Sequence, residues 1–169
     1  MMPTVYLAGP DVFYPDAQDR GDAMRAICRS LGWEGLYPLD AVLPPHTIHP
    51  SRAIYEANCA LLDRANAVVA NLRDFRGAEP DSGTVWEVAY AFAKGKPVVG
   101  YLPDDRPLWA KLGAGQTGGL DPGGCAVENF GLPLNLMVAH SLHALVFGPE
   151  TGHEGLRAAI AALPHPGGG

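Results

Sequence analysis

The chain has 169 residues, of which 47% are hydrophobic and 18% charged, and its formal net charge is −6. This length fits one domain that buries most of its apolar surface, and the composition is that of an ordinary globular protein. The acidic balance, with no run of Lys or Arg, argues against a nucleic-acid polymer or an anionic membrane as the main partner and leaves a small ligand open.

The first 102 residues alternate between short apolar runs typical of buried strands and segments with apolar residues at helical spacing. The first run stops at Gly-Pro, as a buried strand does, and Gly32 suits a helix C-cap. The predicted elements are, in order, a strand at 4–9, a helix at 16–32, a strand at 35–40, a Pro-rich loop at 41–50, a helix at 51–65 with Ser51 as N-cap, a strand at 66–72, a helix at 83–95 and a strand at 96–102.

The pattern weakens after residue 102. Residues 103–133 are rich in Pro, Gly and Asp, and a segment of that length in a compact domain is usually functional or part of an interface. Residues 133–146 and 152–164 predict two closing helices with a short break near Phe147. Residues 165–169 predict a flexible tail.

Strands that alternate with helices indicate right-handed crossovers and a parallel sheet covered by helices on both faces. We therefore expect an α/β fold, a three-layer sandwich, formed as a single domain by residues 1–164.

The cysteines and the N-terminus exclude several classes. Cys28, Cys59 and Cys125 lie far apart and include no C-x-x-C pair, so neither a disulfide framework nor a zinc site is expected. The opening "MMPTVYLAGP" lacks a basic region and an apolar signal stretch. No apolar run approaches the roughly 18–20 residues that span a membrane. We expect a cytoplasmic protein without a metal site.

A glycine-rich segment imitates a cofactor motif. Gly113, Gly115 and Gly118 have the spacing of a dinucleotide fingerprint. That fingerprint must follow a strand and open a helix whose N-terminus holds the pyrophosphate. Here "PLWAKL" precedes it and "GLDPGG" follows, so no dinucleotide cofactor is predicted.

The end of the first strand is a candidate ligand site, because ligands of open α/β sheets bind beyond the carboxyl ends of strands. "YLAGPDVF" places Gly9, Asp11 and Phe13 there. Gly-Pro lets the backbone approach a ligand, and Phe13 offers a ring for stacking. The alternative is a plain strand-ending turn with a core Phe.

The stretch "EPDSGTVWEVAYAFAKGKPVVGY" (79–101) predicts a helix that leads into a buried strand, and it places Asp81 and Glu87 around the first turns of the helix. Glu87 lies off the predicted apolar stripe. That stripe has i, i+3, i+4, i+7 spacing and consists of Val85, Val88, Ala89 and Phe92.

Two interpretations of these acids compete. A structural one makes Asp81 or Ser82 the N-cap and reads Thr84-x-x-Glu87 as a capping box. The functional one notes that the helix starts at the ligand-binding edge and that two acids six residues apart can face one small cavity. The tight "DSGT" turn favours the functional interpretation, because it brings backbone close to a substrate.

"NLRDFRGAEPDSGTVWEVAYAFAKGKPVVGY", with "YLAGPDVF" ahead and "FGLPLNLM" behind, resembles the nucleoside 2-deoxyribosyltransferases over residues 4–147. The resemblance implies a flavodoxin-like fold and transfer of 2-deoxyribose from a 2′-deoxynucleoside to a free base, for nucleoside salvage. It implies a covalent deoxyribosyl-Glu intermediate and overall retention of configuration, with no metal or redox cofactor.

The family's functional residues map onto this chain one by one. The nucleophile falls on Glu87, and the residue that handles the sugar hydroxyls falls on Asp81. Tyr6 corresponds to the tyrosine that orients the nucleophile. Asn135, with Met137 beside it, corresponds to the asparagine that reaches into a neighbouring subunit's site. The resemblance therefore also implies a homo-oligomer, a dimer or a hexamer.

Two positions leave the choice of base open. A base-facing Asp of some relatives is Asn58 here, and an amide can hydrogen-bond a base but cannot donate the proton of a carboxylic acid. A base-reading amide of some members falls near Val42, where no amide stands.

The rival activities are a 2′-deoxynucleoside 5′-phosphate N-hydrolase and a non-catalytic nucleoside-sensing module. The hydrolase relatives tend to carry a Ser where this chain has Asp81. A carboxylate at that position repels a 5′-phosphate, which favours nucleosides over nucleotides.

Overall fold

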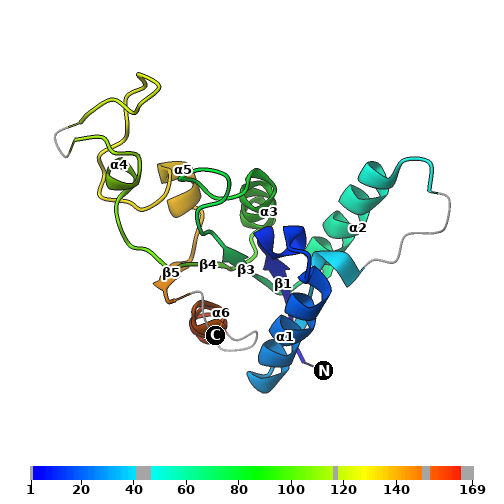
Figure 1. The fold of residues 1–169 in the computed structure, drawn as a ribbon. Helices are drawn as coiled ribbons and strands as arrows, with labels where there is room; N and C mark the ends of the chain where they lie inside the picture. Colours follow the sequence, from blue (N-terminus) through cyan, green and yellow to red (C-terminus); the bar gives the residue numbers. More distant parts are fainter. Residues whose placement is uncertain (1, 41–46, 116–117, 150–152, 165–169) are drawn as a thin grey trace.

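The computed structural model describes residues 2–40, 47–115, 118–149 and 153–164. Val42, most of the predicted 41–50 loop and the predicted 165–169 tail lie outside the described residues. A central sheet runs through the molecule, with helices on both faces (Figure 1).

The sheet has five strands in the order β2-β1-β3-β4-β5, and every neighbouring pair is parallel. This is the strand order of flavodoxin-like folds, which confirms the predicted fold class. The strands are β1 Thr4–Ala8, β2 Glu34–Leu36, β3 Ala67–Asn71, β4 Val98–Leu102 and β5 Ala144–Phe147.

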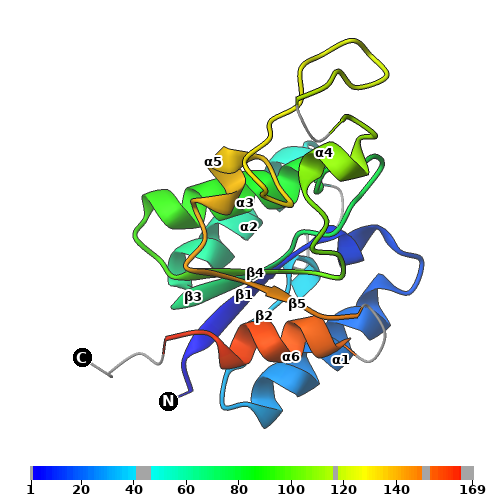
Figure 2. The same ribbon diagram turned by 90° about the vertical axis from the view of Figure 1, so that its left-hand side faces the viewer.

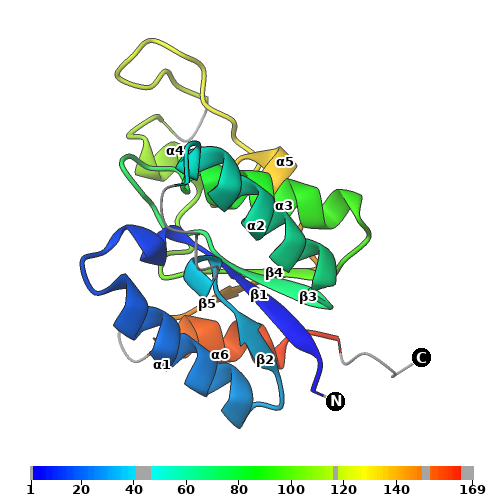
Figure 3. The ribbon, with the colours of Figure 1, turned by 90° about the vertical axis from the view of Figure 1, so that its right-hand side faces the viewer.

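The helices form two layers around the sheet (Figures 2 and 3). One face carries α1 (Ala17–Ser30) and α6 (Glu154–Ala161), and the other carries α2 (Pro50–Arg64), α3 (Ser82–Ala93) and α5 (Leu136–Ala139). Three short elements complete the fold, namely η1 (Pro10–Phe13), η2 (Pro38–Asp40) and α4 (Leu108–Lys111).

Side-chain alternation along the strands divides the interior into two cores. On β1, Val5 and Leu7 pack in the core beneath α1 and α6, whereas Tyr6 and Ala8 pack in the core beneath α2 and α3. Tyr6 is fully buried. The alternation therefore places the Tyr6 side chain on the side of the α2–α3 layer, where the first turns of α3 lie.

The predicted closing helix at 133–146 is wrong. Its first half forms the four-residue α5, and Ala144–Phe147 forms β5, which pairs with β4 from Val99↔Ala144 to Leu102↔Phe147. The backbone of buried β4 needs hydrogen-bond partners along its second edge, and the apolar "ALVF" run supplies them. Tertiary pairing thus overrides a spacing that also suits a helix.

The other boundaries agree to within a few residues, with one local correction. Helix α2 begins at Pro50, with His49 rather than Ser51 at the N-cap position. Proline suits the first helical position because its fixed φ matches the helix and that position needs no N–H. None of the helices in the described part of the chain has both the length and the apolar character needed to cross a bilayer.

Gly21, on the buried side of α1, allows a close approach to Tyr37. A Cβ at Gly21 would lie 2.6 Å from Cδ1 and 2.7 Å from Cε1 of the Tyr37 ring. Tyr37 is fully buried, so the ring has little room to move.

Gly21→Ala is expected to lower the free energy of unfolding by about 1–2 kcal/mol, although alanine is the better helix former by about 1 kcal/mol. Urea denaturation measures the change. In a Tyr37→Leu background the same substitution should cost less, because the clash is relieved. If Gly21→Ala changes the free energy of unfolding equally in both backgrounds, the close packing against Tyr37 carries no cost.

Candidate active site

Asp81 is the N-cap of α3. Its Oδ2 accepts hydrogen bonds from the backbone N of Thr84 at 2.9 Å and from Thr84 Oγ1 at 3.1 Å. The structural interpretation of Asp81 as a cap is therefore correct, and it fixes where the carboxylate sits. The alternative cap Ser82 is the first residue of the helix.

Glu87 lies in the second turn of α3 and belongs to its buried face. The buried residues of the helix are Thr84, Val88 and Ala91, and Glu87 continues this i, i+3, i+4, i+7 spacing. The predicted stripe is thus wrong in phase, since Phe92 is 53% exposed. Helix α3 is apolar on nearly all sides, so periodicity alone does not decide which face packs on the sheet.

Tyr6 and Glu87 meet between β1 and α3. The hydroxyl Oη of Tyr6 donates a hydrogen bond to Glu87 Oε1 at 2.6 Å. Burial of the phenol, followed by the charge of Glu87, raises the pKa of Tyr6 well above its ordinary value. Tyr6 therefore stays protonated and acts as a fixed donor.

The surroundings of Glu87 hold its carboxyl near the point of ionisation at neutral pH. Burial raises the pKa of Glu87 to about 7, and the charge of Asp81 adds to the rise, while the Tyr6 hydrogen bond acts in the opposite direction. A buried carboxylate with a single short hydrogen bond is poorly solvated in its charged form. That is the state of a carboxylate nucleophile or base poised for reaction.

Glu87 faces two adjoining cavities of about 310 and 380 Å³, both of a size that holds a small ligand. The first is lined by Gly9, Val12, Phe13, Pro38, Leu39, Ile54, Asn58, Asp81, Gly83, Thr84 and Glu87. The second is lined by Tyr55, Asn58, Gly83, Trp86 and Glu87. The walls are mainly apolar, and the polar groups that could orient a substrate include the Asp81 and Glu87 carboxylates and the Asn58 amide.

Asn58, on α2, lines both cavities. Its Oδ1 is buried and has no hydrogen-bond partner within the described parts of the chain. A buried acceptor left unsatisfied costs about 1–3 kcal/mol. Asn58 thus brings an amide with an unsatisfied oxygen to the wall of the space next to Glu87.

Phe13 lies at the rim of the first cavity and is 53% exposed. Its ring stacks on Phe75, with 5.3 Å between centroids and 19° between planes. The alternative in which Phe13 is a core residue is therefore wrong. Gly9 lines the same cavity, and a Cβ there would lie 2.8 Å from Asn71 Cβ, so a glycine is required at this strand end.

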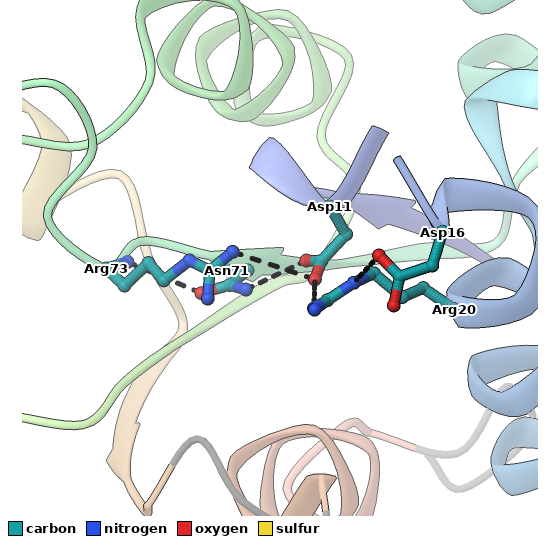
Figure 4. Close-up of polar contacts among 5 residues, drawn as sticks. All are labelled: Asp11, Asp16, Arg20, Asn71 and Arg73. Carbon is teal, nitrogen blue, oxygen red and sulfur yellow. Dashed lines mark hydrogen bonds and ion pairs between the residues drawn. The ribbon is translucent and has the colours of Figure 1, made fainter. Parts of the chain in front are cut away.

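Asp11 does not join these residues. It is buried on the α1–α6 side, where Asn71 Nδ2 donates to its Oδ2 at 2.9 Å and Arg20 forms an ion pair with its Oδ1 at 3.3 Å (Figure 4). Asp11 lines a separate cavity. The structure therefore separates it from Gly9 and Phe13, the other residues of the strand-end motif, which line a Glu87 cavity.

Asn135 and Met137 also lie apart from Glu87 within one chain. Asn135 caps α5, since its Oδ1 accepts from the backbone N of Met137 at 2.9 Å, and its Nδ2 donates to Glu128 Oε1 at 2.5 Å. Both residues line another cavity beside Ser82 and Val85. Met137 is 71% exposed, so this surface is open to a neighbouring molecule.

The sequence prediction missed the aromatic wall of the second cavity. Tyr55 and Trp86 are partly exposed, and their rings meet edge to face at 5.5 Å. The sequence did contain a signal for this wall, because Tyr55 lies three residues before Asn58 and therefore shares its helix face.

The glycine-rich segment lacks the strand and helix that a dinucleotide fingerprint needs: Gly113 follows helix α4, and residues 118–135 contain no helix.

The family model described as Nucleoside 2-deoxyribosyltransferase matches residues 5–137. A solved 2-desoxiribosyltransferase from Leishmania mexicana is 30% identical, with a TM-score of 0.74 over 95% of this chain and 98% of that chain. A 2-deoxyribosyltransferase from Bacillus psychrosaccharolyticus shares the fold, with a TM-score of 0.57, 19% identity and 86% of each chain covered.

A conserved protein from Enterococcus faecalis V583 also shares the fold, with a TM-score of 0.63, 21% identity and coverage of 95% of this chain and 98% of that one. A curated protein of Schizosaccharomyces pombe, described as uncharacterised, is 36% identical over 110 residues, which are 62% of this chain and 52% of that protein. The chain spans about half the length of this curated relative. Because the family model covers most of the chain and the Leishmania mexicana structure matches it nearly end to end, the chain belongs to the nucleoside 2-deoxyribosyltransferase family.

Proposed function

We propose that the protein transfers 2-deoxyribose from a 2′-deoxynucleoside to a free purine or pyrimidine base, as a step of nucleoside salvage. One observation carries the proposal: the buried Glu87 carboxyl, hydrogen-bonded by Tyr6 at 2.6 Å and with a pKa of about 7, forms part of the wall of two ligand-sized cavities. Family membership supports the same activity.

The reaction follows from a carboxylate nucleophile at an anomeric carbon. A Glu87 oxygen attacks C1′ as the bond from C1′ to the base nitrogen breaks, and the departing base keeps the bonding electrons and takes up a proton. The second base attacks C1′ through a ring nitrogen, loses a proton and releases Glu87. Two inversions give net retention.

Tyr6 and Asp81 have separate roles in this scheme. Tyr6 fixes one oxygen of Glu87 and leaves the other to attack. Asp81, held by Thr84, accepts a hydrogen bond from a sugar hydroxyl. Its charge repels a 5′-phosphate, by about 1 kcal/mol at 4 Å in water and by more in a partly desolvated site. Nucleosides are therefore the expected substrates.

The base side of the cavities is aromatic. Tyr55 and Trp86, whose rings meet edge to face, offer aromatic contacts to a base. The amide of Asn58, which lines both cavities, hydrogen-bonds an edge of the base.

We also propose a homo-oligomer in which Asn135 and Met137 complete a neighbouring subunit's site. Both lie outside the Glu87 cavities of their own chain, and Met137 is exposed. The segment before them extends away from the layers (Figure 2) and exposes the apolar residues Leu120 and Phe130. An exposed apolar segment of this kind is suited to contact with another subunit.

Incubation with deoxyinosine and free adenine tests the activity. Transfer yields deoxyadenosine, whereas a hydrolase releases hypoxanthine without it, and a sensing module releases neither.

Glu87→Gln should lower the rate of transfer by about a thousandfold or more, because it removes the nucleophile. Glu56→Gln, on the exposed face of α2, is the matched control. In wild type, a 2-fluoro-2-deoxy nucleoside should label the Glu87 peptide, and a label elsewhere would refute the nucleophile assignment.

The acidic limb of kcat/KM should reflect Glu87. Because the carboxylate must be ionised to attack, kcat/KM should fall as pH drops through about 7. Tyr6→Phe removes the hydrogen bond that lowers the pKa of Glu87, so the limb should move to higher pH. Tyr90→Phe, which removes a hydroxyl bound to Asp63, should leave the limb in place. If the acidic limb stays at the same pH in Tyr6→Phe, the Tyr6 hydrogen bond does not set the pKa of Glu87.

Subunit complementation tests the assembly. Glu87→Ala and Asn135→Ala should each be inactive, while their mixture should recover about a quarter of wild-type sites, since half of randomly formed dimers are hybrids with one intact site. Subunit exchange is first verified by mass spectrometry of differently labelled chains. No recovery after exchange would mean that each chain builds its site alone.

A further inference from the structure

The carboxylate of Glu128 binds two adjacent residues at the start of α5. Glu128 is half-buried and lies seven residues before Asn135. Its Oε1 accepts a hydrogen bond from Asn135 Nδ2 at 2.5 Å, and its Oε2 accepts one from the backbone N of Leu136 at 3.1 Å. Both oxygens of this acid are therefore used to hold the residue that begins the helix and the one after it.

One of these two bonds is more than the helix requires. The first N–H groups of a helix need acceptors, which explains the bond from the Leu136 N–H to Glu128. Asn135 caps α5 through its Oδ1, which accepts from the backbone N of Met137 at 2.9 Å. An N-cap uses only its side-chain oxygen. The bond from Asn135 Nδ2 to Glu128 therefore needs a reason other than the cap.

The bonds at the two ends of the Asn135 amide fix its orientation. Its oxygen faces the Met137 N–H, and its nitrogen faces the Glu128 carboxylate. A flipped amide would place donor against donor and acceptor against acceptor. The bond to an ionised carboxylate is about twice as strong as one between neutral groups. An Asn side chain offers two N–H groups and two lone pairs, so one of each remains for a ligand.

The chain around Asn135 has little regular structure of its own. Residues 118–135 contain no helix, and α5 has only four residues. Few repeating backbone hydrogen bonds therefore hold this part of the chain in place. A side-chain contact such as that of Glu128 is correspondingly important for the position of the amide.

We propose that Glu128 is a positioning residue of the transferase site, which holds the Asn135 amide in the one orientation from which Asn135 binds substrate in the neighbouring subunit. The inference rests on the proposed function and on the proposed assembly. Glu128 acts through Asn135 and does not itself touch the substrate. Its loss should therefore impair the neighbour's site and leave the Glu87 cavities of its own chain unchanged.

The kinetics of Glu128→Gln with deoxyinosine and adenine test this role. The substitution keeps the size of the side chain, but glutamine has one acceptor oxygen, so either Asn135 Nδ2 or the Leu136 N–H loses its acceptor. The value of kcat/KM should fall by about tenfold, because a charge-assisted hydrogen bond is lost.

Asp121→Asn is the matched control, since it is the same change from acid to amide in the same segment. Asp121 Oδ1 accepts from the backbone N of Gly123 at 2.8 Å and of Cys125 at 2.9 Å, so Asp121 also organises local backbone, but before the start of α5. Its kcat/KM should stay within about twofold of wild type. A loss as large as that of Glu128→Gln would overturn the proposal.

Subunit mixing distinguishes a fault in the positioning of Asn135 from a general loss of stability. In the proposed assembly each site takes Glu87 from one chain and Asn135 from the other. Glu128→Gln mixed with Glu87→Ala should therefore recover about a quarter of wild-type sites. Mixed with Asn135→Ala, it should give no more activity than Glu128→Gln at the same dilution, because no hybrid site then has an intact Asn135 side.

Full activity of Glu128→Gln, or recovery with Asn135→Ala instead of Glu87→Ala, would overturn the positioning role while the transferase activity stands. If wild type transfers but Glu87→Ala and Asn135→Ala do not complement each other, the assembly is wrong and this role falls with it. Absence of transfer by wild type would overturn the proposed function itself and this role too. If Glu128→Gln does not fold, Glu128→Asp, which keeps the charge on a shorter side chain, replaces it in the same mixtures.

Discussion

The hydrogen bond between Tyr6 and Glu87 joins strand β1 to helix α3, which starts at the edge formed by the carboxyl ends of the strands. It exists because strand alternation turns Tyr6 toward the α2–α3 layer and because Glu87 falls on the buried face of α3. The N-cap Asp81 sets where that helix begins. A change in the start or phase of α3 would therefore remove the carboxylate from both cavities.

This arrangement costs stability at the pH where Glu87 is charged. Its pKa rises from 4.5 to about 7 on folding. Each pKa unit corresponds to about 1.4 kcal/mol, so ionisation of Glu87 in the folded protein lowers the free energy of unfolding by about 3 kcal/mol. Because the folded pKa is the higher one, the contribution is fully present below 4.5 and is lost as pH rises through about 7. A largely buried acid whose ionisation has this cost is more readily explained by chemistry than by packing.

Much of the fold follows from the sequence, because buried parallel strands are continuous apolar runs and alternate with amphipathic helices. β5 was not predicted, since "ALVF" becomes a strand only when the edge of β4 is there to pair with it. The phase of α3 could not be predicted either, because an almost wholly apolar helix has no preferred face until the sheet provides one. The motif resemblance predicts Glu87, Asp81 and Tyr6 as site residues, and the fold brings these three together.

The strand-end motif after β1 contributes residues to cavities on both faces of the sheet. At the end of β1, Gly9 lines a Glu87 cavity, whereas Asp11, two residues later, lines the separate cavity that Arg20 and Arg73 also line. Asn71 at the end of β3 stands between them: its Cβ occupies the space that a side chain at Gly9 would need, and its amide holds Asp11. Both cavities thus depend on the close approach of two neighbouring strand ends. A side chain larger than hydrogen at Gly9 would displace Asn71 and disturb the Asp11 cluster as well as the Glu87 site, because packed interiors transmit such displacements.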